Sequence, residues 1–587
     1  MDKYTDILRT WWGYDEFRPL QADIIKSIGA GHDTLALMPT GGGKSICFQV
    51  PALAQEGLCL VVTPLVALMK DQVENLRRRE VKATAVYTGM THQEIQAALA
   101  ACQFGGYKFL YVSPERLEST AFRQRLVQLP VSMIAVDEAH CISQWGYDFR
   151  PSYLRIAQIR QILRQSSPDG TDVPILALTA TATPDVIDDI QDKLEFREHR
   201  VFRKSFLRSN LSYVVRQTDN KPLQLLRILH NVPGSSVVYV RNRKRTKEIS
   251  DFLNEQGISA TYYHAGLGNQ EKDLRQRLWK NYGTTGESVR CMVATNAFGM
   301  GIDKPDVRTV IHMDLPDTLE AYFQEAGRAG RDGKQAYAVL LYHKDDPAKL
   351  RKRVADNYPE RTFIKRVYEA LGDYFEVALG YGLDHTFVFP FEQFCAEKHL
   401  PLLPAFSAIQ ILSQAGYLAY TDETETSPRV HILCSRDDLY KEQLTDKQDA
   451  VVHYLLRHCE GIFSDPVYIN ESRMADELHI PVRRLNQELI AMAQQRVLQY
   501  IPRRKTPYIT FTHEREILER LNIPASVYEK RLENYTSKLN AMLEYARQTQ
   551  FCRSQLLLSY FGENDAEPCG QCDVCRSKQQ STTEEQA

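Results

Sequence analysis

One glycine-rich segment of this 587-residue chain has the residue types needed to hold a phosphate group. Residues 41–43 are glycines that precede Lys44 and Ser45, between a run that predicts a strand and one that predicts a helix. Glycine lets backbone N–H groups curve around phosphate oxygens, and a helix N-terminus favours negative charge. Lys44 would reach the β- and γ-phosphates, and the Ser45 hydroxyl would bind Mg²⁺. The strict motif has glycine where this chain has Met38, so an ordinary glycine-rich turn is the alternative.

Two adjacent acids, Asp137 and Glu138, follow a later apolar run in the same pattern. A carboxylate at the end of a strand suits Mg²⁺, and a neighbouring Glu can orient and deprotonate an attacking water. The alternative is that both acids only stabilise the start of a helix. Together with the glycine-rich segment, the pair predicts hydrolysis of a nucleoside triphosphate.

A cluster of cysteines late in the sequence has the spacing of a metal site. Zn²⁺ readily binds four thiolates, which a helix followed by a tight turn would bring together. A disulfide pair and an iron–sulfur cluster are the alternatives. Because no catalytic acid accompanies the cysteines, we expect a structural site whose loss destabilises the C-terminal region before it slows any chemical step. The four predicted ligands are Cys552, Cys569, Cys572 and Cys575.

Alternating apolar and amphipathic segments predict the elements that position these residues. Nearly continuous apolar strands separated by helix-length segments are typical of parallel sheets covered on both faces. The pattern stops near 203–220 and then starts again, which predicts an α/β fold with two tandem parallel-sheet domains. The predicted strands are 33–38, 58–63, 84–88, 109–113, 132–137 and 175–179, then 236–240, 260–264, 291–295, 309–314 and 337–342.

Beyond residue 350 the pattern changes to helices and short hairpins. Two segments, 391–420 and 471–500, each contain a helix, a proline-containing turn and a second amphipathic helix. Each leads into a predicted hairpin, the first near 420–433 and the second near 500–511. This order of elements is typical of a winged helix, which is a helix-turn-helix with a β-hairpin.

Composition argues against several other classes of protein. Lys and Arg number 72 and Asp and Glu 74, so the chain lacks a histone-like positive surface, although a local basic groove could still bind phosphates. It has no apolar run of about 18 residues, and acids near its start argue against a secretory signal. We therefore expect a cytoplasmic protein, associated with the nucleoid if bacterial. The cysteines outside the cluster are expected to be buried thiols.

Three further groups of residues accompany the nucleotide motifs. Tyr14, Arg18 and Gln21 precede the glycine-rich segment, an aromatic-rich segment at 141–151 directly follows the acidic pair, and an arginine-bearing segment at 324–333 lies in the second half. In this order the motifs resemble the superfamily-two helicases and, within them, the RecQ family of DNA helicases. The resemblance covers about 10–345 and resumes at 535–576, around the cysteines.

The resemblance implies roles in binding and hydrolysing ATP. A Gln amide can pair with the edge of adenine while Tyr14 and Arg18 stack on it, which implies ATP rather than GTP. Arg331 would donate charge to the γ-phosphate, with Arg328 organising it, and surface ion pairs are the alternative. The implied catalytic residues are Lys44, Asp137, Glu138, Gln324, Arg328 and Arg331. The implied nucleotide and Mg²⁺ contacts are Tyr14, Arg18, Gln21, Thr40, Gly41, Gly43, Lys44, Ser45, Asp137 and Asp303.

The resemblance also implies contacts with single-stranded DNA. Trp145 and Phe149 offer flat rings on which unpaired bases stack, and their closeness to Asp137 could link strand contact to ATP hydrolysis. A buried aromatic cluster is the alternative. The implied DNA contacts are Thr63, Pro64, Ser113, Arg116, Trp145, Phe149, Arg150 and Thr295.

The resemblance implies RecA-like helicase domains followed by a zinc module. In typical relatives the zinc module directly follows the second helicase domain, whereas here the winged-helix-like segments come between them. The predicted domains are 1–205 (RecA-like, ATP-binding), 206–350 (RecA-like), 351–440 and 441–522 (winged-helix-like), 523–576 (helical zinc module) and 577–587 (a disordered tail).

The implied function is an ATP-dependent DNA helicase that moves 3′-to-5′ on single strands and unwinds duplexes in repair or recombination. ATP, Mg²⁺ and Zn²⁺ would be its cofactors, and single-stranded or forked DNA and single-strand-binding or repair proteins its partners, with no membrane. The hairpin near 500–511 has a basic turn and is favoured for duplex contact over the acidic one near 420–433, with a solvated turn as the alternative. The rival functions are an RNA-directed helicase of the same superfamily and a non-catalytic DNA-binding scaffold.

Overall fold

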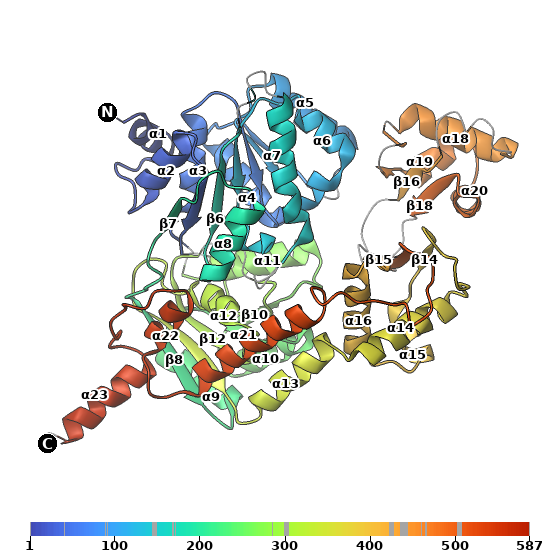
Figure 1. Ribbon diagram of the computed structural model, residues 1–587. Coiled ribbons are helices and arrows are strands. Elements are labelled where there is room, and N and C mark those ends of the chain that lie inside the picture. Colours follow the sequence, from blue (N-terminus) through green and yellow to red (C-terminus); the bar gives the residue numbers. More distant parts are fainter. Residues whose placement is uncertain are drawn as a thin grey trace.

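The computed structural model contains two α/β lobes, two small mixed units and a C-terminal group of helices (Figure 1). It describes residues 2–585 except 40, 88–89, 91, 144–148, 167–169, 171, 284–285, 299–303, 422–427, 435–438, 440–443, 460, 464–465 and 502–506. Thr40, Trp145, Asp303 and the turns of both predicted hairpins therefore lie outside the described residues. Among the described helices, none combines the length and the apolar character needed to cross a bilayer.

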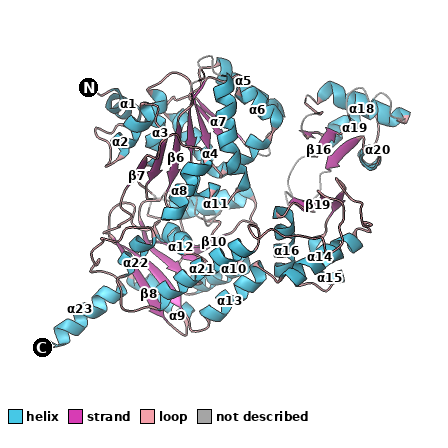
Figure 2. Ribbon diagram, viewed as in Figure 1, coloured by secondary structure: helices cyan, strands magenta, loops and turns pink. Residues whose placement is uncertain are grey.

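The first lobe is a seven-stranded parallel sheet with helices on both faces (Figure 1, Figure 2). Every residue of β1, β2, β4 and β6 is buried, which explains why these strands are continuous apolar runs. The strand order is β3-β4-β2-β5-β6-β1-β7. The strands are β1 (Thr34–Leu37), β2 (Leu58–Val62), β3 (Ala83–Val86), β4 (Phe109–Val112), β5 (Val131–Val136), β6 (Ile175–Thr179) and β7 (Val201–Arg203). The helices are α1 (Lys3–Trp12), α2 (Gln21–Gly29), α3 (Lys44–Leu53), α4 (Val66–Arg78), α5 (His92–Phe104), η1 (Pro114–Glu118), α6 (Thr120–Leu126), η2 (Ala139–Ile142), η3 (Pro151–Leu154), α7 (Arg155–Ser166) and α8 (Pro184–Lys193).

The second lobe is a six-stranded parallel sheet, and the two sheets together confirm the predicted α/β class. Its strand order is β10-β11-β9-β12-β13-β8. The predicted linker 203–220 contains an unpredicted edge strand, β8, which pairs along the whole of β13, so the connection between the lobes is shorter than expected. The strands are β8 (Leu211–Gln217), β9 (Ser235–Tyr239), β10 (Ala260–Tyr263), β11 (Cys291–Ala294), β12 (Val307–His312) and β13 (Ala336–Tyr342). The helices are α9 (Lys221–Asn231), α10 (Arg243–Glu255), α11 (Asn269–Lys280), α12 (Leu319–Ala326) and α13 (Asp346–Asn357).

Two units with winged-helix elements follow the second lobe. In the residues that the structure describes, each unit has three helices, a three-stranded sheet and its own apolar core. The first consists of α14 (Arg361–Tyr374), β14 (Thr386–Val388), α15 (Phe391–Glu397), α16 (Leu402–Gln414), β15 (Leu418–Thr421) and β19 (Tyr508–Phe511). The second consists of β16 (Arg429–Ile432), α18 (Asp446–His458), β17 (Val467–Tyr468), α19 (Glu471–Glu477), α20 (Val482–Gln494) and β18 (Leu498–Ile501).

The sheets of the two units exchange strands relative to the predicted hairpins. β16 follows β15 in the chain but belongs to the sheet of the second unit, and β19 follows β18 but belongs to the sheet of the first. β15 pairs with the distant β19, and β16, the next strand along the chain, pairs instead with β17 and β18. The hairpins predicted near 420–433 and 500–511 were therefore wrong, and the pairing crosses the predicted boundary between residues 440 and 441. Local alternation of apolar and polar residues indicates a strand but does not identify its partner. As a result, residues 429–501 form a unit inserted between two paired strands of another unit.

The described part of the chain ends in three helices, each of which contacts the second lobe. Leu539, Met542 and Leu557 belong to the same apolar core as residues of both sheets. The prediction of a disordered tail was wrong for 577–585, which continue the last helix. That segment contains Lys, Gln and Glu but no glycine or proline, so the helix that starts beside the cysteines continues through it. The helices are α21 (Glu529–Arg547), α22 (Arg553–Tyr560) and α23 (Asp573–Glu585).

Replacing residues 422–507 with a short turn containing Asn-Gly should leave the first winged-helix unit folded. Thr421 and Tyr508 are opposite each other in antiparallel β15 and β19, so a turn can close these strands into a hairpin. We expect a cooperative thermal transition and a circular dichroism spectrum that loses only the helices of the second unit. Loss of cooperative unfolding, or aggregation, would contradict the strand exchange.

Candidate functional site

The glycine-rich segment between β1 and α3 has the geometry of a phosphate-binding loop. Gly41 and Gly43 have left-handed backbone conformations, with φ of 80° and 82°. A Cβ at Gly43 would overlap the buried amide of Gln21, so this position needs glycine for space as well as for conformation. Lys44 and Ser45 follow as the first residues of α3, where a helix N-terminus favours an anion.

The residues predicted to hold adenine contact this loop. The Gln21 amide nitrogen donates to Gly43 O at 3.0 Å, and its oxygen accepts from Arg18 N at 2.9 Å. Arg18 Nη1 donates to Gly41 O at 2.6 Å, whereas Tyr14 is 53% exposed. Gln21 therefore supports the phosphate-binding loop in this structure, and pairing with adenine would require it to exchange these hydrogen bonds.

Lys44 lies between the two predicted carboxylates. Its ammonium is 3.5 Å from Glu138 Oε1 and 4.0 Å from Asp137 Oδ1. Burial alone would lower the pKa of Lys44, but the two negative charges outweigh it and raise this pKa. Burial raises the pKa of Asp137 to about 6. Burial would also raise the pKa of Glu138, but the neighbouring Lys44 and His140 outweigh burial and lower this pKa.

His140 contacts Glu138, although the sequence assigned no role to this histidine. Its Nδ1 lies 3.5 Å from Glu138 Oε2 and 2.9 Å from Thr179 Oγ1 at the end of β6. The imidazole therefore connects the ionised carboxylate to the neighbouring segment that begins at Thr179. The position of His140 directly after the acidic pair was the available signal, but spacing along the chain does not show which groups its ring faces.

Two arginines of the second lobe lie close to the predicted catalytic residues of the first. A Cβ built on Gly41 would lie 3.6 Å from Arg331 Cγ, so the Arg331 side chain packs directly on the loop. Arg331 and Arg328 are close enough for their charges to act on Lys44 and Glu138 respectively. The structure thus brings together five predicted catalytic residues from the two lobes. They are Lys44, Asp137, Glu138, Arg328 and Arg331, and Gln324 is buried within α12, about one turn before Arg328.

Four of the residues predicted to contact DNA, all in the first lobe, are buried or hydrogen-bonded to the protein. Thr63 and Ser113 follow the adjacent strands β2 and β4 and are 1% and 2% exposed. Arg116 donates to a backbone carbonyl at 3.1 Å, and Arg150 donates to Pro64 O at 3.4 Å. Thr63 and Ser113 lie at the carboxyl ends of neighbouring strands, as a shared role would require. Contact of their buried hydroxyls with DNA would require the surrounding segments to move.

A cavity of about 550 Å³ lies where both lobes meet α21. Phe149 lines it from the first lobe, Asn296 from the second, and Arg531 and Lys538 from α21. Thr295, the residue before Asn296, is buried. The aromatic residue predicted to stack on bases therefore shares a space with basic side chains from a part of the chain that was predicted only to bind zinc.

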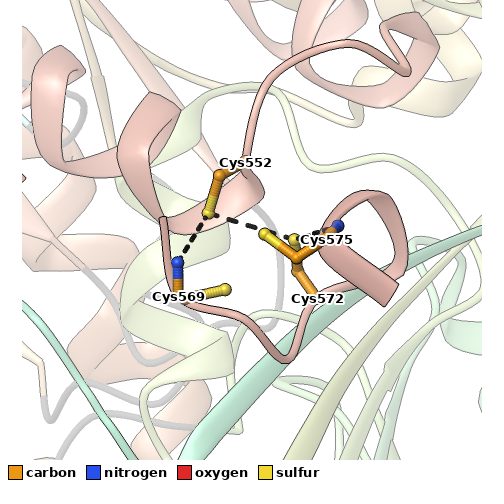
Figure 3. A group of neighbouring side chains, drawn as sticks. All are labelled: Cys552, Cys569, Cys572 and Cys575. Carbon is orange, nitrogen blue, oxygen red and sulfur yellow. Dashed lines mark hydrogen bonds between the residues drawn. The ribbon is translucent and has the colours of Figure 1, made fainter. Parts of the chain in front are cut away.

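Four thiols converge between α22 and α23 (Figure 3). Their sulfurs all lie within 4.8 Å of one another, and Cys552 Sγ is 4.0 Å from Cys572 Sγ. A disulfide needs about 2.05 Å, whereas sulfurs bonded tetrahedrally to Zn²⁺ at about 2.3 Å are about 3.8 Å apart. Asp573 forms a 3.0 Å ion pair with Arg553, which joins the two cysteine-bearing segments. The predicted cysteine set therefore fits zinc.

Known families match this chain in four successive regions. Models described as DEAD/DEAH box helicase and helicase conserved C-terminal domain match 18–190 and 220–333. Models described as RecQ helicase winged-helix domain, Bacteroidota, and RecQ zinc-binding match 430–502 and 512–576. The probable ATP-dependent DNA helicase RecS of Bacillus subtilis is 40% identical over 346 residues, which are 58% of this chain and 67% of that protein. The chain belongs to the RecQ family.

A second relative agrees with this membership in the RecQ family, and one solved structure has a similar fold. The ATP-dependent DNA helicase RecQ of Pasteurella multocida is 39% identical over 374 residues, or 63% of this chain, and the match spans only 57% of that relative's length. The crystal structure of the DUF1998 helicase MrfA bound to DNA has a TM-score of 0.50 and 18% identity over 60% of this chain and 53% of that chain, which supports the fold alone. The winged-helix model covers the inserted unit from β16 to β18, in agreement with the strand exchange.

Removal of zinc is expected to destabilise this RecQ-family protein. Cys572→Ser should reduce the zinc content and lower the Tm by about 5 °C or more, because a buried structural metal contributes directly to the free energy of folding. Metal analysis and differential scanning calorimetry measure both effects. Cys434→Ser, at a half-buried cysteine outside the cluster, is the matched control. An unchanged Tm after verified loss of zinc would contradict a structural role.

Lys44→Ala is expected to reduce ATP turnover by at least about 100-fold while nucleic-acid binding is retained. The substitution removes the positive charge nearest Asp137 and Glu138, so these buried carboxylates would repel a triphosphate. Phosphate release and fluorescence anisotropy with a labelled oligonucleotide separate the two effects. Lys193→Ala, at the end of α8, is the control. Normal turnover in Lys44→Ala would exclude this loop as the site of hydrolysis.

Proposed function

We propose that this RecQ-family chain is an ATP-dependent DNA helicase that moves 3′-to-5′ along single-stranded DNA. The observation that carries the proposal is the packing of Arg331, from the second lobe, on the phosphate-binding loop of the first. A nucleotide at this position would be held from both sides. Its binding and hydrolysis would therefore change how the two lobes lie relative to each other.

Each side chain in the cleft has a chemical role in this proposal. Lys44 and the N-terminus of α3 bind the β- and γ-phosphates, and Arg331 neutralises charge that develops on the γ-phosphate. Glu138, whose pKa is lowered by Lys44 and His140, orients the attacking water and accepts its proton. Ser45 and Asp137 offer the hydroxyl and carboxylate oxygens that Mg²⁺ prefers, and Mg²⁺, when bound, would neutralise phosphate charge.

The aromatic segment and the relatives favour DNA over RNA as the single strand that this protein binds. Phe149 lines the cavity where the two lobes meet α21, a position suited to stacking on an unpaired base. The two relatives described above are named as DNA helicases. The direction of travel and a role in repair or recombination rest on the family resemblance, as do single-strand-binding or repair proteins as partners.

A strand-displacement assay tests the proposed function. With ATP and Mg²⁺, a duplex with a 3′ single-stranded tail should be unwound and one with a 5′ tail should not. Movement begins on the single-stranded tail, and 3′-to-5′ movement leads into the duplex from a 3′ tail but away from it on a 5′ tail. Glu138→Gln should abolish unwinding. Preference for the 5′ tail would reverse the proposed direction, and unwinding only from an RNA tail would favour the RNA-directed alternative. Binding without any ATP turnover would favour the scaffold.

A further inference from the structure

Helix α21 contacts both lobes. In Figure 1 it lies across the second lobe beside α12, and the two helices are in contact. Arg531, Tyr535 and Lys538 are four and three residues apart, so they share one face of the helix. All three line the cavity that Phe149 also lines.

The first contact of α21 is with the segment that follows the hydrolytic acids. The Arg531 guanidinium lies 5.2 Å from the centre of the Phe149 ring, a cation–π contact between the zinc module and the first lobe. Arg150, next to Phe149, donates its backbone N–H to Cys141 O at 2.8 Å, within the short helix η2 that follows Glu138. Movement of Phe149 therefore affects α21 on one side and the hydrolytic segment on the other.

The second contact of α21 is with the helix that leads to the catalytic arginines. Two turns after Arg531, Lys538 Nζ is 2.8 Å from Glu320 Oε1, and these side chains are only 10% and 4% exposed. Glu320 is in the first turn of α12, which ends just before Arg328. Two residues further along α12 and two turns further along α21, the rings of Tyr322 and Tyr545 are 5.4 Å apart. Because a buried ion pair has a strict geometry, Lys538 fixes α12 relative to α21.

We propose that Arg531 and Lys538 are positioning residues that couple strand contact at Phe149 to the catalytic arginines through α21. This inference rests on the proposed function, because it concerns how DNA stimulates ATP hydrolysis. A strand that displaces Phe149 changes the Arg531 contact, and the rigid helix carries this change to Glu320 and α12. The helix that precedes the zinc ligands thus has a role in stimulation by DNA in addition to a role in stability.

The test compares basal and DNA-stimulated ATPase rates of the full chain with oligo(dT). Arg531→Met, which keeps an apolar chain of similar length but loses the charge, should retain the basal rate and lower the stimulated kcat by roughly tenfold. Arg531→Lys, which keeps a cation above the ring, should restore part of the stimulation. Lys530→Ala, at the exposed neighbouring position, should match the unchanged protein. Equal Tm values and zinc contents would show that the variants are folded.

A double variant tests whether the two contacts act through one helix. Lys538→Met should also lower the stimulated kcat, and Arg531→Met/Lys538→Met should lose no more stimulation than the more affected single variant. Multiplication of the two single effects would overturn the coupling. Full stimulation of Arg531→Met would overturn this inference while leaving the proposed helicase intact. Absence of stimulation in the unchanged protein would overturn both. If Arg531→Met is unstable, the Arg531→Lys comparison decides on the same readout.

Discussion

The charge balance around Lys44 is the constraint on which the catalytic cleft depends. One buried ammonium faces two carboxylates, Asp137 and Glu138, and a bound triphosphate would add further negative charge. Buried charges are stable only when they are paired. Arg328 and Arg331 of the second lobe add positive charge close to Glu138 and Lys44. Charged groups from both lobes therefore meet at this site, which lies between the two sheets.

Parallel topology is what brings the groups of the first lobe together. The phosphate-binding loop follows β1 and the acidic pair follows β5, and both strands flank β6, so their carboxyl ends lie at the same edge. Thr179, at the end of β6 itself, is connected to Glu138 through His140. The sheet thus places residues from three distant parts of the sequence within hydrogen-bonding distance of one another.

The zinc module lies late in the sequence but beside the helicase lobes in space. Phe561 of this module packs on Phe206 in the connection between the lobes, with ring centres 5.3 Å apart, and Glu563 accepts a hydrogen bond from Phe206 N at 2.8 Å. The winged-helix units therefore lie between α13 and α21 in the sequence, and the chain returns to the lobes at α21. Because of the strand exchange, the chain passes between the two winged-helix units twice, after β15 and after β18. Arg496 Nη2 of the second unit also lies 3.4 Å from His385 Nε2 of the first unit.

The features that could be predicted from the sequence are those encoded over a few neighbouring residues. Apolar runs predicted most strands of both sheets, and the positions of Lys44, of Asp137 and of the cysteines predicted which residues come together, because glycine conformation, strand ends and metal ligands each have a local signature. The exchange of β16 and β19, the contact of Arg331 with Gly41, and the place of α21 beside α12 could not be predicted in this way. These features depend on contacts between residues far apart in the chain, and local periodicity records that a segment has an apolar face without recording which distant segment covers it.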